Sequence, residues 1–95
     1  MDLPGFQRAL RDVYGDRDAA RGSDATFRWM VEEVGELARA MRRDDPVNLQ
    51  DEFGDVLAWL ASLANLLEVD LDAAAARYEG GCPRCGRTPC GCGSR

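Results

Sequence analysis

Apolar residues recur at intervals of three and four along most of the chain, and this spacing constrains the fold more than any other feature. Such a period places side chains on one face of an α-helix. No stretch shows the alternation typical of a strand, and alanine is abundant. The sequence therefore predicts an all-α chain of four helices. Its 95 residues allow one domain at most, and a chain this short buries only about 60% of its unfolded surface. A partner subunit or a metal would therefore add needed stability.

The first helix is predicted to begin at Leu3, with Asp2 as its N-cap, and to end near Gly15. Residues 15–23 mix charges and glycine without periodicity, which favours a loop. A second helix then begins after Ser23 or Asp24 and ends at about residue 43. One apolar stripe along it comprises Phe27, Met30, Val31, Val34, Leu37, Ala38 and Met41.

Asp45 and Pro46 are a predicted cap and first residue of a third helix. The later half of this helix is apolar almost all round, so we expect it to be buried centrally or against another subunit. Asp70 caps a shorter fourth helix over LDAAAARYE, which ends at two glycines. Residues 1–80 are thus predicted to form a helical domain, and residues 81–95 a separate cysteine-rich tail.

The charged residues exclude several kinds of chemistry. All twelve basic residues are arginine, so lysine and histidine mechanisms and histidine metal ligands are excluded. General acid–base catalysis would therefore require carboxylates, thiols, tyrosine or a metal-bound water. A net charge of −5 argues against binding a nucleic-acid polymer.

Features that would direct the chain to or across a membrane are missing from the sequence. The amino terminus lacks the apolar region of a secretory signal, and the longest apolar stretch, residues 56–67, is far shorter than the roughly 20 residues of a membrane span. Four cysteines bunched at one end of such a chain favour a metal over disulfides. We therefore expect a cytoplasmic protein without membrane contact.

Carboxylates flank the apolar stripes of the second and third helices. Antiparallel packing of these helices would bring four of them together: Glu33, Glu36, Glu52 and Asp55. Like charges this close repel, and a divalent cation removes the penalty. Mg²⁺ suits such oxygen ligands. The alternative from periodicity alone is an ordinary solvated acidic face with surface ion pairs.

Two motifs decide between these interpretations. Glu32-Glu33-Val34-Gly35-Glu36-Leu37 and Asp51-Glu52-Phe53-Gly54-Asp55-Val56-Leu57 resemble the paired EExxE and ExxD motifs of MazG-like nucleotide pyrophosphohydrolases. These enzymes belong to the all-α NTP pyrophosphatase superfamily, and the resemblance covers about residues 3–79. Gly35 and Gly54 also fit, because a glycine inside a helix is costly and suggests close helix approach.

The resemblance implies hydrolysis of nucleoside triphosphates between the α and β phosphates, which gives a monophosphate and pyrophosphate. It implies that Glu33, Glu36, Glu52 and Asp55 are Mg²⁺ ligands, and that Glu32 orients or deprotonates the attacking water, so Glu32 and Glu33 are the predicted catalytic residues. It also implies substrate binding at a subunit interface. We expect a homo-oligomer, either a dimer or a tetramer built as a dimer of dimers.

The sequence specifies the substrate contacts less closely than the metal ligands. Trp59, one turn beyond Asp55, is predicted to contact the base, and Trp29 holds the equivalent place on the second helix, although both could be packing residues. Arginines must supply positive charge for the triphosphate. Arg39 and Arg43 are predicted for this role among a wider set that includes Arg17, Arg21 and Arg42. The loop between the second and third helices and the fourth helix are shorter than in larger relatives, which leaves base selectivity open.

Two alternatives to this function remain open from the sequence. Phosphoribosyl-ATP pyrophosphohydrolase resembles the same fold and splits the same bond. A non-catalytic helical adaptor could instead use the tail to bind a protein partner.

The tail contains Cys82, Cys85, Cys90 and Cys92 in a C-x2-C-x4-C-x-C pattern. Cys-Pro-Arg-Cys-Gly is typical of a zinc knuckle, and four thiolates would form a closed structural zinc site. The intervals are tighter than in most zinc ribbons. A flexible reducible tail and a redox pair are the other interpretations.

Overall fold

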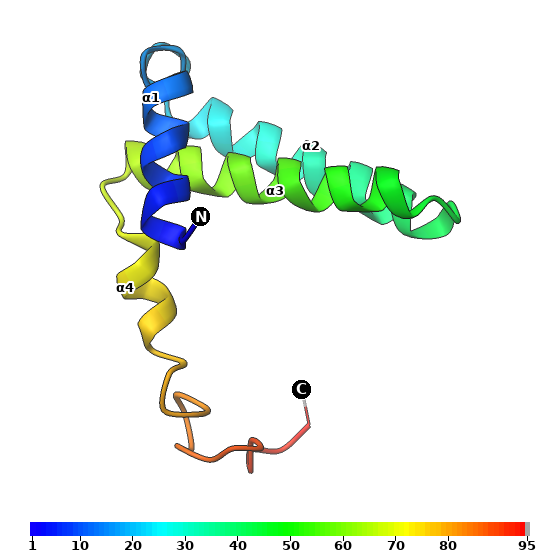
Figure 1. The fold of residues 1–95 in the computed structure, drawn as a ribbon, viewed down its shortest axis with the longest axis vertical. Coiled ribbons are helices and arrows are strands. Elements are labelled where there is room, and N and C mark those ends of the chain that lie inside the picture. Colours follow the sequence, from blue (N-terminus) through cyan, green and yellow to red (C-terminus); the bar gives the residue numbers. More distant parts are fainter. Residues whose placement is uncertain (95) are drawn as a thin grey trace.

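The computed structural model describes residues 1–94, which form four helices and no strand (Figure 1). The predicted all-α class is therefore confirmed. None of the described helices combines the length and hydropathy that a membrane span requires. The helices are α1 (Leu3–Arg21), α2 (Ser23–Arg42), α3 (Pro46–Leu66) and α4 (Leu71–Ala76).

Helices α2 and α3 pack side by side over most of their length and form an arm (Figure 1). Helix α1 crosses one end of this arm and packs mainly on α3. Helix α4 leads away from the same end, and the segment after it bends back below the arm (Figure 1). The two motif helices are thus neighbours, as the predicted carboxylate site requires.

Three of the helix starts follow directly from local side-chain chemistry. The Asp2 carboxylate accepts a hydrogen bond from the Gly5 N–H at 2.8 Å, and the Asp45 carboxylate accepts one from the Asn48 N–H at 3.2 Å. Asp70 accepts bonds from the N–H groups of the first turn of α4. Each bond satisfies a backbone donor that a helix start leaves free. All three predicted caps are confirmed.

The end of the first helix was predicted wrongly. Helix α1 continues through Gly15 and the expected loop to Arg21, and only Gly22, at φ 87°, separates it from α2. Arg21 holds the corner: it donates to the buried Asp18 carboxylate at 2.9 Å and to the Thr26 hydroxyl at 3.2 Å. This polar contact between helices offsets the weak local helix signal of the segment.

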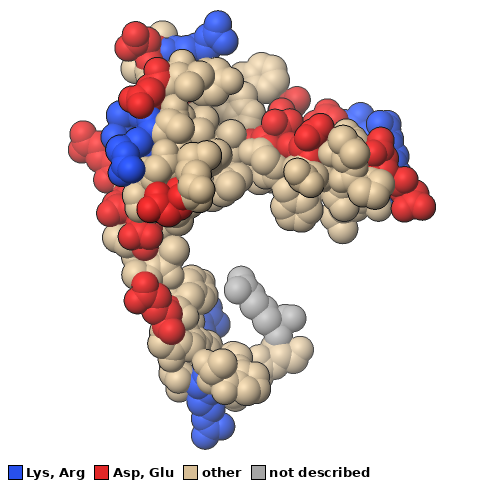
Figure 2. Space-filling model, in the orientation of Figure 1, with Lys and Arg blue, Asp and Glu red and all other residues tan. Residues whose placement is uncertain are grey.

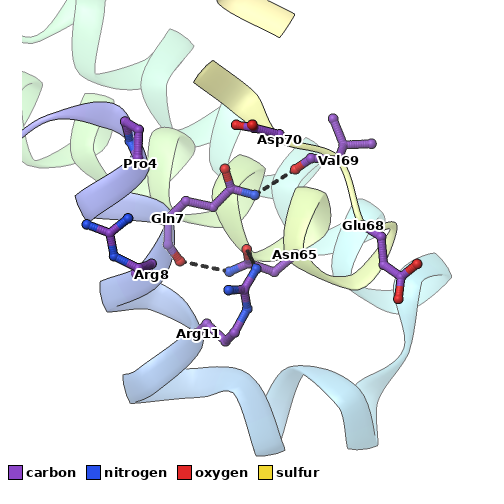
Figure 3. Close-up of a pocket in the computed structure, with 8 residues that line it drawn as sticks. All are labelled: Pro4, Gln7, Arg8, Arg11, Asn65, Glu68, Val69 and Asp70. Atoms are coloured by element: carbon purple, nitrogen blue, oxygen red, sulfur yellow. Dashed lines mark hydrogen bonds between the residues drawn. The ribbon is translucent and has the colours of Figure 1, made fainter. Parts of the chain in front are cut away.

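The amino-terminal half of α1 holds the connection between α3 and α4 (Figure 3). The Gln7 side chain donates to the Val69 carbonyl at 2.7 Å and accepts from the Leu71 N–H at 3.0 Å. Asn65 at the end of α3 donates to the Gln7 carbonyl at 3.0 Å (Figure 3). The open hollow in Figure 3 is therefore lined by groups that join helices. Helix α4 itself ends at Ala76, before the predicted glycines, and turns occupy the intervening residues.

The core of a single chain lies along one edge of the α2 stripe. Buried apolar residues within the described chain are few, and all but one are alanine: Leu10, Ala40, Ala61 and Ala64. The α2 edge that faces α3 includes Thr26 and Glu33, whereas Phe27 is 50% exposed and Met41 is 70% exposed. On α3, Phe53 is 59% exposed. The predicted apolar stripe of α2 is therefore only partly buried within a single copy of the chain.

These exposed residues define one apolar face, which comprises Phe27, Val31, Val34, Met41, Phe53, Leu57 and Leu60. On each helix the exposed set lies about a quarter turn from the residues that face the other helix. Because α2 and α3 run antiparallel, both sets fall on the same side of the arm.

The two motif glycines do not mark close helix approach within the chain. A Cβ added at Gly35 or Gly54 would meet nothing within 4 Å. Both residues are exposed, so the expectation of tight packing at these positions was wrong for a single copy.

Candidate active site and metal centre

Carboxylates from α2 and α3 meet on the side of the arm opposite the apolar face. Glu33, Glu52 and Asp55 offer oxygen atoms that all lie within 4.8 Å of one another. Glu33 lies at the edge of α2 that packs on α3, and Glu52 and Asp55 lie one turn apart on α3. Figure 2 shows acidic side chains gathered along this side of the arm and uncharged surface below it. Helix packing therefore brings together residues that are distant in sequence.

The electrostatics of this group favour a bound cation. Partial burial raises the pKa of the Glu33 carboxyl above its ordinary value of 4.5, and the charges of Asp55 and Glu52 raise that pKa further. The Glu52 Oε2 atom is buried and has no hydrogen-bond partner among the described residues. An unpaired buried carboxylate oxygen beside two further carboxylates is a donor set that fits a hard, oxygen-seeking dication.

The other two predicted carboxylates lie outside this group. Glu36, one turn after Glu33, accepts a hydrogen bond from Arg39 at 3.0 Å in an exposed ion pair. Glu32 is exposed and lines a groove on α2 with Phe27 and Val31. It therefore points to a different side of α2 from Glu33.

The two tryptophans lie together beside the carboxylates. Their rings stack with centroids 6.1 Å apart and an angle of 16° between planes. The Arg21 guanidinium lies 4.7 Å from the centre of the Trp59 ring, within range of a cation–π contact. Trp59 thus packs against both neighbours, while Trp29 stays half exposed.

A cavity of about 240 Å³ opens between α1 and α3 next to this stack. Asp55 and Trp59 line it from α3, and Tyr14, Arg17 and Asp18 line it from α1. Sequence reasoning missed Asp18 because it placed this residue in a loop, and it assigned no role to Tyr14 on the predicted first helix. A signal was available: Asp18 and Arg21 have the spacing of an ion pair on one helix face.

The arginines predicted to bind substrate occupy the outer part of the arm. Arg39 is exposed and paired with Glu36, and Arg43 is the exposed C-cap residue of α2. Figure 2 shows basic side chains at this outer end, next to the acidic side chains. Arg21 and Arg17 lie at the other end of the site, beside Trp59.

The four cysteines form a second group, well apart in sequence from the carboxylates. The sulfur atoms of Cys82, Cys85, Cys90 and Cys92 all lie within 4.8 Å of one another. The structure therefore brings together the residues of the predicted knuckle.

The described chain is all-helical, and its two central helices present a carboxylate group suited to a dication. The family of the chain follows from its sequence match. Residues 21–79 match the MazG nucleotide pyrophosphohydrolase domain, and the chain belongs to this family. The match begins at the end of α1 and includes both motifs. No curated protein matches the chain significantly.

Proposed function

We propose that this protein hydrolyses nucleoside triphosphates to nucleoside monophosphate and pyrophosphate in a Mg²⁺-dependent reaction. The observation that carries the proposal is the convergence of Glu33, Glu52 and Asp55 in a chain of the MazG family. A triphosphate brings its own negative charge to this acidic surface, so binding requires a cation between the two.

The three converging carboxylates would hold the ion. When bound, Mg²⁺ would supply positive charge to the phosphate oxygens and favour deprotonation of the attacking water. Glu36 would join the group if its carboxylate released Arg39. That release would also free the Arg39 guanidinium for the triphosphate, which links two predicted residues in one rearrangement.

Glu33 is the better placed of the two proposed catalytic residues. It lies in the carboxylate group that would hold the ion, so it would lie next to the attacking water. Glu32 lies on another side of α2, so its proposed role requires a substrate or partner that extends over that side. Activity of Glu32→Gln beside that of Glu33→Gln would rank the two.

The cavity between α1 and α3 is our proposed base site. Trp59 would present an aromatic surface next to Asp55, with Trp29 stacked on its other side. At about 240 Å³ the cavity admits only part of a nucleotide, so the triphosphate would extend from it toward the carboxylates. Arg43 lies at the far end of the arm, so it would contact only the terminal phosphate of a substrate.

A homo-oligomer is part of the proposal. The apolar face has seven large side chains that are 40–70% exposed, which is more than a monomer of this size ordinarily leaves in water. A second copy of the same face would cover it symmetrically. A dimer would cover this apolar face, and a tetramer would pair two such dimers. The free cysteines fit a reducing, cytoplasmic location.

The test is pyrophosphate release from a panel of NTPs and dNTPs, with and without Mg²⁺, and with phosphoribosyl-ATP as a further substrate. We expect Glu52→Gln to lower kcat/KM about 100-fold or more, because it removes a ligand and the buried charge. Asp51→Asn is the matched control: Asp51 precedes Glu52 but is exposed and outside the group.

Two results would contradict the proposal. One is the absence of turnover with every nucleotide, which would favour the adaptor. The other is equal loss in Glu52→Gln and Asp51→Asn. If phosphoribosyl-ATP alone is turned over, the proposed bond cleavage stands, but the proposed substrate is wrong.

A further inference from the structure

The tail thiols have the separation that a tetrahedral metal site needs. Cys82 Sγ and Cys92 Sγ lie 3.8 Å apart, and all four sulfur atoms lie within 4.8 Å of one another. A tetrahedron of sulfurs about 2.3 Å from a central ion has edges of about 3.8 Å. The four thiols are free, so the sulfur atoms are grouped without any disulfide.

The backbone around the first two cysteines forms a tight turn. The Gly86 N–H donates to the Cys82 carbonyl at 2.7 Å, and the Cys82 N–H donates to the Arg87 carbonyl at 3.0 Å. Gly86 has φ 75°, a conformation that glycine adopts without strain. Gly81 has φ 108°, and a Cβ there would come within 2.7 Å of the Thr88 hydroxyl. The tail is thus folded closely on itself.

Donors and positive charge surround the sulfur atoms. The Gly91 N–H donates to Cys85 Sγ and the Cys92 N–H donates to Cys90 Sγ, both at 3.3 Å. Hydrogen bonds of this kind hold ligand atoms in place around a metal. The Arg87 side chain lies over Gly91, where an added Cβ would come within 3.0 Å of Nη1. It places a positive charge beside a group that keeps net negative charge when it holds a dication.

We propose that Cys82, Cys85, Cys90 and Cys92 bind one structural Zn²⁺ ion through four thiolates, and that this ion fixes the fold of the tail. Binding releases the thiol protons, and the four sulfurs fill every coordination position, so the site has no role in hydrolysis. Soft thiolates select Zn²⁺, whereas the carboxylate group selects a hard ion. This inference goes beyond the proposed function and stands without it.

The first experiment is metal analysis of the full chain purified under reducing conditions. We expect about one zinc per chain in the parent and in Glu52→Gln, and less than a tenth of that in Cys90→Ser. Ser94→Ala is the matched control in the tail and should keep its zinc. Co²⁺ in place of zinc should give the absorption of a tetrahedral thiolate site in the parent and not in Cys90→Ser.

The second readout is limited trypsin digestion after Arg84 and Arg87, with excess Mg²⁺ throughout. A zinc-selective chelator should speed cleavage at these two positions about tenfold or more, because the metal holds the tail folded. Cleavage after Arg77, which lies outside the four-cysteine segment, should change little.

Three outcomes would overturn the assignment: a reduced parent without zinc, zinc retained in Cys90→Ser, or iron in place of zinc. Equal cleavage of the tail with and without the chelator would refute the structural role.

Discussion

The two sides of the arm formed by α2 and α3 are opposites. One side gathers carboxylates from both helices, and the other exposes phenylalanine, leucine, valine and methionine. Each side is unfavourable for a single chain in water: the first because like charges repel, the second because apolar surface remains hydrated. The same pair of helices thus leaves two unfavourable surfaces; the proposed cation would relieve one of them and the proposed second copy the other.

The largest expected effect comes from placing a charge on the apolar face. Phe53→Asp should raise the dissociation constant of the oligomer about 30-fold or more, because it buries an unpaired charge at the contact. Sedimentation over a range of protein concentrations measures this change.

The control for that experiment is Val13→Asp, which makes the same kind of change at an exposed apolar residue of α1, outside the face. A parent that is monomeric at all concentrations would remove the proposed second copy. Equal behaviour of the two variants would show that the apolar face is not the contact.

An intermediate effect is expected on the acidic side. Mg²⁺ at about 10 times its dissociation constant should stabilise the parent by about 1.4 kcal/mol, because the ion binds the folded carboxylate group. Thermal unfolding with and without Mg²⁺, at matched ionic strength, measures the increase in Tm. Asp51→Asn should keep the increase and Glu52→Gln should lose most of it; an increase that survives in Glu52→Gln would place the ion elsewhere.

The smallest effect concerns pH. The pKa of Glu33 is raised in the folded chain by burial and by Asp55 and Glu52. Between the ordinary value of 4.5 and the raised pKa, the folded chain therefore binds more protons than the unfolded chain. Without divalent ions, stability should fall as pH rises through this range.

Denaturant midpoints at a series of pH values check this slope. Glu33→Gln should reduce it, since glutamine does not titrate, and saturating Mg²⁺ should reduce it as well. A slope that is unchanged in Glu33→Gln would assign the effect to other carboxyls.

Part of this structure could be predicted because it depends on neighbours in the sequence. Asp2, Asp45 and Asp70 cap helices through bonds to residues two or three positions away, so their roles do not depend on the rest of the fold. The end of α1 could not be predicted in this way. It depends on the contact of Arg21 with Thr26 and Trp59, which belong to two other helices.

The same distinction applies to the candidate site: part of it could be predicted from spacing within each helix, and part depends on contacts that spacing does not specify. Helical spacing put Glu33, Glu52 and Asp55 on the flanks of two stripes, and their convergence could be expected once the helices were paired. The same reasoning included Glu36, which in the structure forms an ion pair with Arg39. Spacing cannot decide between an intrahelical partner and a neighbouring helix, because both lie within reach of a long side chain.

The sequence by itself determined that the chain is helical, where most helices begin, and that four cysteines within eleven residues lie close together. Only the tertiary structure decided which edge of the α2 stripe faces α3. That choice turned Glu33 inward and left Phe27 and Val31 outward. The physical reason is that apolar burial has no preferred direction, so a wide stripe can pack along either edge. The rotation of each helix about its own axis is set by the other helices on which it packs.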